Sequence, residues 1–203
     1  MTTPQHNLAV IKVVGIGGGG TNAIKRMIGE GMTGVDFIAL NTDEQDLLDC
    51  DAPTKLDIGQ STTRGLGAGA DPAVGERAAR DNSQDIEDVL TGADMVFVTA
   101  GEGGGTGTGG APIVAGIARG LGALTVAVVT KPFSFEGKRR ADNAEHGIEK
   151  LRDACDTLIT IPNDRLLQQE DKTISINEAF SKADEVLFNG VQGITDQIGR
   201  AHV

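Results

Sequence analysis

Short apolar runs alternate with helix-compatible stretches along most of the chain. The apolar runs are rich in β-branched residues and span 8–14, 35–40, 54–58, 94–100, 124–130 and 156–161. Most are apolar at consecutive positions, as expected of strands that helices cover on both faces. The helix-compatible stretches are 21–32, 71–90, 111–122 and 138–154. This alternation predicts an α/β fold: a Rossmann-like, doubly wound, mainly parallel six-stranded sheet with helices on both faces.

A longer periodic segment follows the last apolar run. Ser175 and Glu178 have the spacing of a capping box. Apolar residues then recur every three or four positions as far as Ile198, which is the pattern of one helix face. We therefore expect a long core helix over 175–198, of about six turns, after a domain that spans 1–174.

Composition narrows the range of functions. The chain has 203 residues, of which 39% are hydrophobic, enough for one well-buried domain. Its net charge of −11 argues against nonspecific binding to nucleic acid or to anionic lipid. Cys50 and Cys155 match no metal-ligand spacing, so we expect free thiols in a reducing compartment. With no apolar run long enough to cross a membrane, we expect a cytoplasmic protein without direct membrane insertion.

Glycine is concentrated where predicted strands end. The three glycine-rich loops are "GIGGGGTN" at 15–22, "GQSTTRGLGAGADP" at 59–72 and "AGEGGGTGTGGAP" at 100–112. In a parallel sheet, the loops at the carboxyl ends of the strands line the ligand crevice. Successive N–H groups without side chains bind anions, and a helix N-terminus adds partial positive charge. These loops therefore predict a cradle for a polyphosphate.

The first loop alone satisfies a dinucleotide-binding pattern. Gly15, Gly17 and Gly20 fit G-x-G-x-x-G, and Asp43 follows the second predicted strand as the acidic residue that such a site uses. An NAD(P)-binding oxidoreductase is therefore one open interpretation, although it leaves the other two glycine-rich loops unexplained. A mononucleotide held by several loops accounts for more of the sequence.

None of these loops has the lysine of a Walker A motif. Phosphate charge must then be met by N–H dipoles, by an arginine such as Arg64 or Arg140, and by a hydrated Mg²⁺. We expect the first and last glycine-rich loops to lead directly into helices. Thr21 and Thr108 are the candidate N-caps, with Pro112 in a first helical turn.

The loops also carry a family resemblance. "GGGTGTG" at 103–109 resembles the signature loop of the tubulin and FtsZ superfamily. Further stretches follow in that family's order: "GIGGGGTNA", "LNTDEQ", "TRGLGAGADP", "KPFSFEGKRR", "IPNDRLL" and "NEAFSKADEVL". The resemblance extends over residues 8–196, and Glu102 and Gly110 stand where the family more often has Met and Ala. It favours the bacterial cell-division branch, with tubulin-like plasmid-partition GTPases as the nearest alternative.

The resemblance implies a site for GTP or GDP with Mg²⁺. The residues that it assigns to the phosphates are Gly18, Gly19, Gly20, Thr21, Ala68, Gly69, Gly105, Thr106 and Gly107. Those that it assigns to the ribose are Glu136 and Arg140, and those for the guanine are Asn22, Asn163, Phe180 and Asp184. Mg²⁺ would be held through the phosphates and water, with Asp43 as a further candidate. Asp184 can accept both the N1–H and N2–H of guanine, a donor pair that adenine lacks, which favours GTP over ATP.

The resemblance also implies a self-assembling GTPase. In that family, hydrolysis is completed by an acidic loop from the adjacent subunit, within a head-to-tail homopolymer that forms the cytokinetic ring at the division site. Division proteins would bind a C-terminal region.

We expect this chain to lack the acidic loop and the C-terminal domain, and residues 199–203 to be a tail outside the family pattern. It would then contain no catalytic residue of its own, bind nucleotide, and hydrolyse GTP poorly when alone. A noncatalytic assembly module that uses nucleotide only for order is the other open class, and nucleic acid is not an expected partner.

Overall fold

The central sheet has six parallel strands in the order β3-β2-β1-β4-β5-β6. The computed structural model describes residues 8–168 and 173–201. The strands are β1 (Ile11–Ile16), β2 (Asp36–Asn41), β3 (Thr54–Asp57), β4 (Met95–Gly101), β5 (Leu124–Lys131) and β6 (Thr157–Pro162). The order reverses between β1 and β4, which is typical of a Rossmann-like sheet. The predicted fold class is confirmed.

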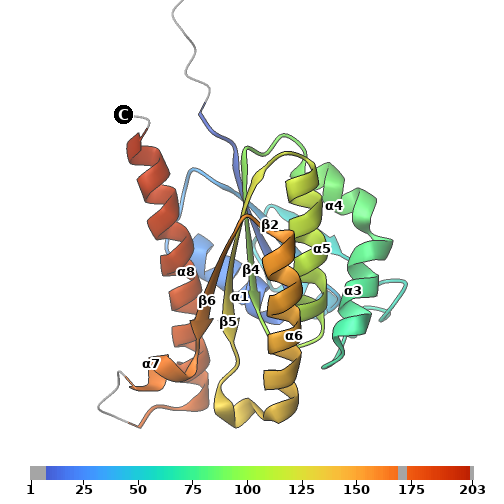
Figure 1. Ribbon diagram of the computed structural model, residues 1–203, viewed down its shortest axis with the longest axis vertical. Helices are drawn as coiled ribbons and strands as arrows, with labels where there is room; N and C mark the ends of the chain where they lie inside the picture. Colours follow the sequence, from blue (N-terminus) through green and yellow to red (C-terminus); the bar gives the residue numbers. More distant parts are fainter. Residues whose placement is uncertain (1–7, 169–172, 202–203) are drawn as a thin grey trace, which may run out of the picture.

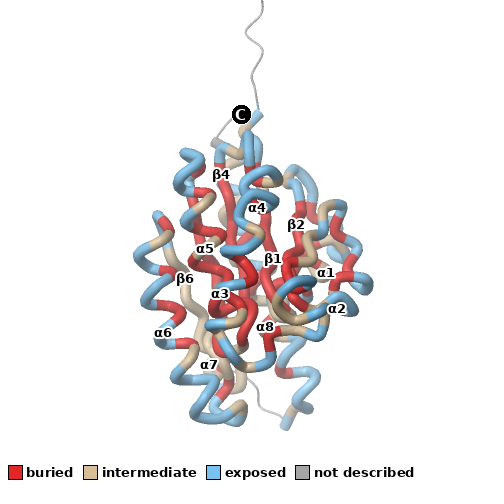
Figure 2. Tube along the Cα trace, turned by 90° about the vertical axis from the view of Figure 1, so that its right-hand side faces the viewer, coloured by how far each residue is buried: buried red, intermediate tan, exposed pale blue. Residues whose placement is uncertain are grey.

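Helices cover both faces of this sheet (Figure 1). They are α1 (Gly17–Gly29), α2 (Glu44–Leu48), α3 (Pro72–Asp81), α4 (Ser83–Leu90), α5 (Thr106–Gly120), α6 (Lys138–Ala154), α7 (Asp164–Gln168) and α8 (Ile176–Ala201), with a 3₁₀ turn, η1 (Ser134–Glu136). One buried cluster joins the sheet to α3–α6, and a second joins it to α1, α2 and α8. Figure 2 shows the buried positions gathered along the strands between these two layers.

Two predicted helix starts are wrong. α1 begins at Gly17, so Thr21 lies one turn inside it and donates its hydroxyl to the carbonyl oxygens of Gly17 and Gly18 at 3.0 and 3.1 Å. Thr108 likewise lies inside α5, where its hydroxyl oxygen accepts the Gly103 N–H at 2.8 Å. Pro112 is interior to α5 rather than in its first turn. In both cases the helix begins within or directly after the glycine tract, before the predicted threonine cap.

The stretch 71–90 forms two helices rather than one. α3 and α4 are separated at Asn82, whose side-chain amide donates to the carbonyl oxygens of Ala78 at 2.8 Å and Ile58 at 3.1 Å. Asparagine side chains compete with the backbone for such acceptors, which interrupts a helix. The short elements α2, α7 and η1 were also not predicted; each lies within a connection between longer elements.

The long core helix is confirmed as α8. The Ser175 N–H donates to Glu178 Oε2 at 2.7 Å, and the Glu178 N–H donates to Ser175 Oγ at 3.2 Å, so the capping box is present. The buried side chains of α8 are those of Ala179, Ala183, Leu187 and Val191. Residues 199–201, assigned by the sequence to a tail, continue the helix. No helix among residues 8–168 and 173–201 combines the length and hydropathy that a bilayer crossing requires.

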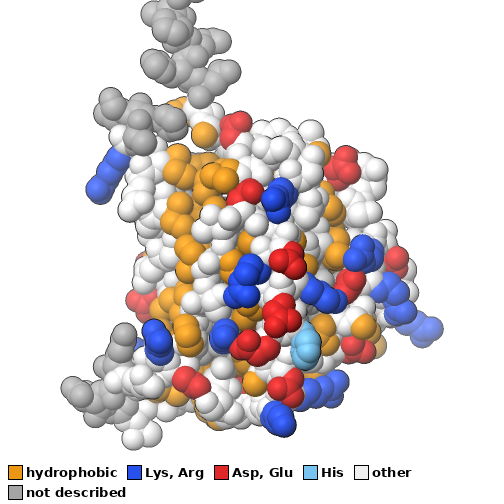
Figure 3. Space-filling view, viewed as in Figure 1, with side chains coloured by type: hydrophobic (Ala, Val, Ile, Leu, Met, Phe, Trp, Pro, Cys, Tyr) orange, Lys and Arg blue, Asp and Glu red, His pale blue; other side chains and the backbone are white. Residues whose placement is uncertain are grey.

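Partly buried apolar side chains also lie along α8 and β6. They include Ile159 and Ile161 of β6, and Phe188, Ile194 and Ile198 of α8. In Figure 3 hydrophobic side chains form a band on the face where these two elements lie.

Close packing holds α3 against the start of α5. A methyl group at Gly109 would overlap the Pro72 carbonyl oxygen and lie 2.5 Å from the Glu76 nitrogen. Gly116, further along α5, has nothing within 4 Å of the same position. The α3 backbone therefore lies directly against Gly109, whereas a side chain at Gly116 would point into open space.

We expect Gly109→Ala to destabilise the fold by about 1–3 kcal/mol, because α3 must shift to admit the methyl group. Gly116→Ala is the matched control, and we expect it to be neutral or to stabilise by about 0.5–1 kcal/mol, since alanine is the better helix former. Urea denaturation followed by circular dichroism measures both. Equal free energies of unfolding for the two variants would contradict the packing described.

Candidate functional site

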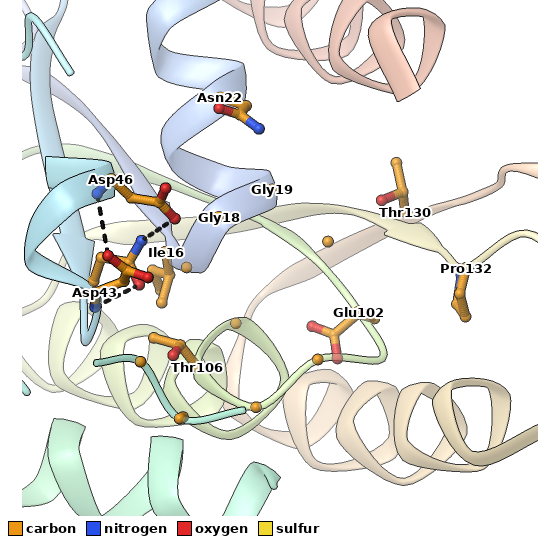
Figure 4. Close-up of a pocket in the computed structure, with 18 of the residues that line it drawn as sticks. Ile16, Gly18, Gly19, Asn22, Asp43, Asp46, Glu102, Thr106, Thr130 and Pro132 are labelled. Carbon is orange, nitrogen blue, oxygen red and sulfur yellow. Dashed lines mark hydrogen bonds between the residues drawn. The ribbon is translucent and has the colours of Figure 1, made fainter. Parts of the chain in front are cut away.

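A cavity of about 570 Å³ lies at the carboxyl ends of the strands, where the strand order reverses. Its walls are the starts of α1 and α5, the 66–69 loop, the ends of β4 and β5, and the first half of α8 (Figure 4). Crevices at this point of a doubly wound sheet are the usual ligand sites of the fold. The position therefore agrees with the crevice expected from the glycine-rich loops.

The structure brings together all but two of the residues that the resemblance assigns to the site. Those that line the cavity are Gly18, Gly19, Asn22, Ala68, Gly69, Gly105, Thr106, Gly107, Glu136, Arg140, Asn163, Phe180 and Asp184, and Asp43 lines it too. Gly20 and Thr21 are buried in α1 and do not reach the cavity surface. Gly20 instead packs on the strands, because a methyl group there would lie 2.6 Å from the Thr99 carbonyl oxygen. Arg64 does not line the cavity.

One end of the cavity is formed by backbone. Gly17 has φ of +71°, and a methyl group there would lie 2.9 Å from the Gly107 nitrogen. A methyl group at Gly19 would lie 2.9 Å from the Gly101 nitrogen. Neither α1 nor α5 has a side-chain N-cap hydrogen bond, so N–H groups of both first turns are left for a ligand. Two helix N-termini that meet at one cavity make a site for an anion.

Polar side chains flank this end. Asn41 donates its amide to Asp46 Oδ2 at 3.2 Å, and Asp43 Oδ1 accepts the N–H groups of Gln45 and Asp46 at 3.0 and 3.3 Å. Thr106 Oγ1 is 2.6 Å from Thr42 Oγ1, a hydrogen bond that ties α5 to the end of β2. Sequence reasoning missed Asn41 and Asp46; the position of Asn41 at the end of a predicted strand was the available signal. Among the residues described, no group of three or more His, Cys, Asp or Glu side chains is arranged to bind a metal.

The opposite end combines aromatic rings with polar groups. Phe180 meets Phe133 and Phe135 edge to face, with ring centroids 5.5 and 6.0 Å apart. Asn163 is buried, and its Oδ1 has no hydrogen-bond partner. Asp184 also lies at this end of the wall. A flat ring with N–H donors would suit this arrangement, because it could contact Phe180 while its donors reach these oxygens.

The charge of Asp184 is sensitive to pH. Burial raises the pKa of Asp184 to about 6, while Arg26 and Lys25 of α1 act in the opposite direction. Arg26 also donates to Ser181 Oγ at 3.1 Å and lies 3.5 Å from Glu185 Oε2, so α1 is linked to this turn of α8.

Glu136 and Arg140 both line the cavity, and Arg140 Nη1 would lie 3.7 Å from a methyl group at Gly104. The Glu136 and Arg140 side chains are 3.8 Å apart, and Glu136 Oε2 accepts the Phe133 N–H at 2.7 Å. The Arg140 side chain is 44% exposed, so its guanidinium remains accessible from the cavity.

Glu102 is the unexpected feature of this site. It follows β4, lines the cavity, and is only 4% exposed. Neither carboxyl oxygen has a hydrogen-bond partner, and burial raises the pKa of Glu102 to about 8. The signals in the sequence were a charged residue within an otherwise neutral glycine-rich run and its departure from the Met that the family pattern more often has there. Burial of an unpaired carboxylate is costly, so this group is held as the neutral acid near pH 7.

Comparison with known proteins gives concordant results. Residues 10–171 match the family model described as "Tubulin/FtsZ family, GTPase domain". The structure is similar to that of an FtsZ dimer from M. jannaschii, determined empty, with a TM-score of 0.92 and 48% identity over 96% of this chain and 56% of that one. It also resembles the GDP-bound monomer of CetZ1 from Haloferax volcanii, with a TM-score of 0.79 and 24% identity over 89% of this chain and 58% of that one.

A third similar structure is a protofilament of CetZ2 from Haloferax volcanii with GTPγS bound. The TM-score is 0.80 with 24% identity, over 90% of this chain and 57% of that one. This chain therefore spans little more than half the length of each of these proteins.

We expect Glu102→Gln to stabilise the protein in a pH-dependent way. The carboxyl ionises near its ordinary pKa of 4.5 when the chain is unfolded but only at about 8 when it is folded. Between these values a rising pH favours the unfolded state, so Glu102 costs stability that glutamine would not. The variant should gain on the order of 2–4 kcal/mol over the wild type at pH 8, and the difference should shrink toward pH 5.5.

Urea denaturation at several pH values measures this difference. Glu145→Gln is the control, because Glu145 is exposed and the adjacent Lys131 lowers its pKa. That variant should show no gain that grows with pH. A gain for Glu102→Gln that is the same at pH 5.5 and pH 8 would contradict the buried acid.

Proposed function

The chain belongs to the Tubulin/FtsZ family, and on that premise we propose that it is the GTP-binding domain of a self-assembling GTPase that acts in cell division. One observation carries the proposal: α1 and α5 begin at one end of a single cavity, and Asn163, Phe180 and Asp184 line the other. A nucleotide requires such a pair of ends, one for phosphate and one for base. The family assignment and this two-ended cavity do not favour the alternative of an NAD(P)-dependent oxidoreductase.

In this proposal the phosphates lie against the backbone. Gly18 and Gly19 of α1 would hold the α and β phosphates, and Gly105, Thr106 and Gly107 would hold the β and γ phosphates. Uncapped N–H groups support this, because they offer hydrogen bonds and positive dipole ends without a lysine. Gly20 and Thr21 would not contact the phosphates, and would act by shaping the first turn of α1.

The 66–69 loop would contact the γ phosphate through Ala68 and Gly69. Its contact with α5 supports this, since the Gly105 N–H donates to the Gly69 carbonyl oxygen at 3.1 Å. Loss of the γ phosphate would thereby affect both the 66–69 loop and the loop that contains Gly105.

The other end would select guanine. Asp184 would accept the N1–H and N2–H groups, Asn22 and Asn163 would supply further hydrogen bonds, and Phe180 would stack on the ring. The unpartnered Asn163 Oδ1 supports this role, because buried acceptors normally have a donor. Glu136 and Arg140, which also line the cavity, would hold the ribose.

The donor set also fits Mg²⁺. Asp43 and Asp46 are carboxylates beside the phosphate end, and a Mg²⁺ ion prefers oxygen ligands while keeping several waters. When bound, the ion would neutralise phosphate charge. Asp43 would orient one of its waters, and Asp46, already bonded to Asn41, would add negative charge nearby.

Hydrolysis would be completed by a neighbouring subunit of the same protein. Positioning and electrostatics supply most of the catalysis in phosphoryl transfer, so an acidic loop from that subunit could orient the attacking water. The FtsZ dimer and the CetZ2 protofilament among the similar structures support assembly. Location at the division site, and division proteins as partners, belong to the same proposal.

The test is a comparison of melting temperatures with GDP, GTP, ATP and NAD, each with Mg²⁺. Binding stabilises the folded state by about 2.7 kcal/mol at one hundred times Kd, so GDP and GTP should raise the melting temperature by roughly 5–10 °C. ATP and NAD should have little effect. A rise with NAD and none with either guanine nucleotide would refute the proposal.

Asp184→Asn should remove the guanine preference, because an asparagine amide cannot accept both N–H groups. We expect the GTP-to-ATP affinity ratio to fall by about 10–100-fold, the effect of lost hydrogen bonds to a charged group. Since the pKa of Asp184 is about 6, the wild-type ratio should also fall as the pH drops through 6, whereas the variant ratio should not change. Phosphate protonation affects both nucleotides and cancels in the ratio.

Competition binding with a fluorescent nucleotide measures these ratios between pH 5.5 and 7.5. Asp196→Asn, near the far end of α8, is the control and should retain the wild-type ratio. Guanine selectivity that survives Asp184→Asn would show that the base is bound elsewhere.

A further inference from the structure

Glu102 has no role in the nucleotide site described above, yet it lies within it. Its N–H donates to the Thr130 carbonyl oxygen at 2.9 Å, which fixes the residue between the end of β4 and β5. Figure 4 shows its carboxyl group beside the first turn of α5. The next residues of the chain, Gly103 to Gly107, are the loop assigned to the β and γ phosphates.

The carboxyl group is enclosed by α5 and α6. Glu102 Oε2 would be 2.6 Å from a methyl group at Gly147 of α6, and the Thr108 methyl group borders the same point. Both carboxyl oxygens lack partners, and 4% of the residue is exposed. A buried acid without a partner lowers the stability of the fold, because an apolar side chain could fill the same space without a burial penalty.

Several charged groups on the surrounding elements pair with groups other than Glu102. On β5, Lys131 pairs with Glu145 at 2.8 Å; on α6, Arg140 lies 3.8 Å from Glu136 and Lys150 lies 3.1 Å from Glu76 of α3. His146 of α6 contacts the Asp142 carbonyl oxygen through Nδ1 at 2.8 Å. The segment 106–118 of α5 contains no charged residue. Within the described part of the chain, burial is the cause of the raised Glu102 pKa, and no cation offsets it.

We propose that Glu102 is a proton-linked residue of the phosphate site, which must be the neutral acid for a nucleoside diphosphate or triphosphate to bind. The inference rests on the proposed function. Its reason is electrostatic: an ionised carboxylate buried in the cavity wall, directly before residues 103–107 in the chain, would repel the phosphates in a medium of low dielectric. Binding to the ionised form therefore takes up one proton from solvent onto the Glu102 carboxyl group.

The consequence is an alkaline limit to binding. Above pH 8 the free protein loses the Glu102 proton, and each complex formed must recover it, so affinity falls by up to about tenfold per pH unit. The direction is opposite to that of Asp184, whose carboxyl group must be ionised to serve the base.

The experiment is isothermal titration calorimetry of the full chain with GDP and Mg²⁺ at pH 8.5, in two buffers of different ionisation enthalpy. The difference between the apparent enthalpies gives the number of protons taken up. We expect an uptake of between one half and one proton for the wild type and none for Glu102→Gln. Between pH 7.5 and 9 the wild-type Kd should rise several-fold more than that of the variant.

Glu145→Gln serves as the control, since it removes an exposed carboxylate outside the cavity and should retain the wild-type proton uptake. If Glu102→Gln fails to fold, Glu102→Met provides a second neutral variant of similar volume. Equal proton uptake in the wild type and the neutral variant would overturn the inference about Glu102 but not the proposed function. Absence of GDP binding by the wild type at pH 7.5 would instead overturn the proposed function.

Discussion

Backbone contact between the first turns of α1 and α5 is the constraint on which the rest of the structure depends. β1 and β4 are adjacent, so the helices that follow them begin side by side. Gly17 then lies against Gly107, and Gly19 against Gly101, with no room for a side chain. Ordering glycine is costly, and the contact gives in return a cavity wall made of peptide groups. The 66–69 loop is attached to this wall, because the Gly105 N–H donates to the Gly69 carbonyl oxygen.

α8 connects the end of the cavity that is proposed for the base to that wall. Its buried face packs in the same core cluster as α1, and Arg26 of α1 bonds to Ser181 at the turn that carries Phe180 and Asp184. The end of the cavity proposed for the base is therefore held by the same helix whose start forms the end proposed for the phosphates. A shift of α1 would reach both ends of the cavity.

The sequence predicts the sheet, its helical layers and α8, because apolar runs and a capping box are local patterns. Through the resemblance it also predicts many of the residues that line the cavity, but it wrongly includes Gly20 and Thr21 and misses Asn41 and Asp46. The helix starts are wrong because threonine is a good N-cap, whereas here the glycine tract forms the first turn. Asn82 divides a helix through contacts with Ile58 that are distant in sequence. The burial of Glu102 depends on α6, and no local pattern reports it.

A wall of peptide groups also limits how this protein can change over evolutionary time. Substitution alters side chains, but every residue presents the same N–H and carbonyl groups. Replacement of a glycine at the α1–α5 contact would obstruct the wall without altering its chemistry. A competitive inhibitor that bonds mainly to these main-chain atoms would therefore leave few viable routes to resistance, whereas one that relies on a side chain not needed by the nucleotide could be evaded by a single codon change.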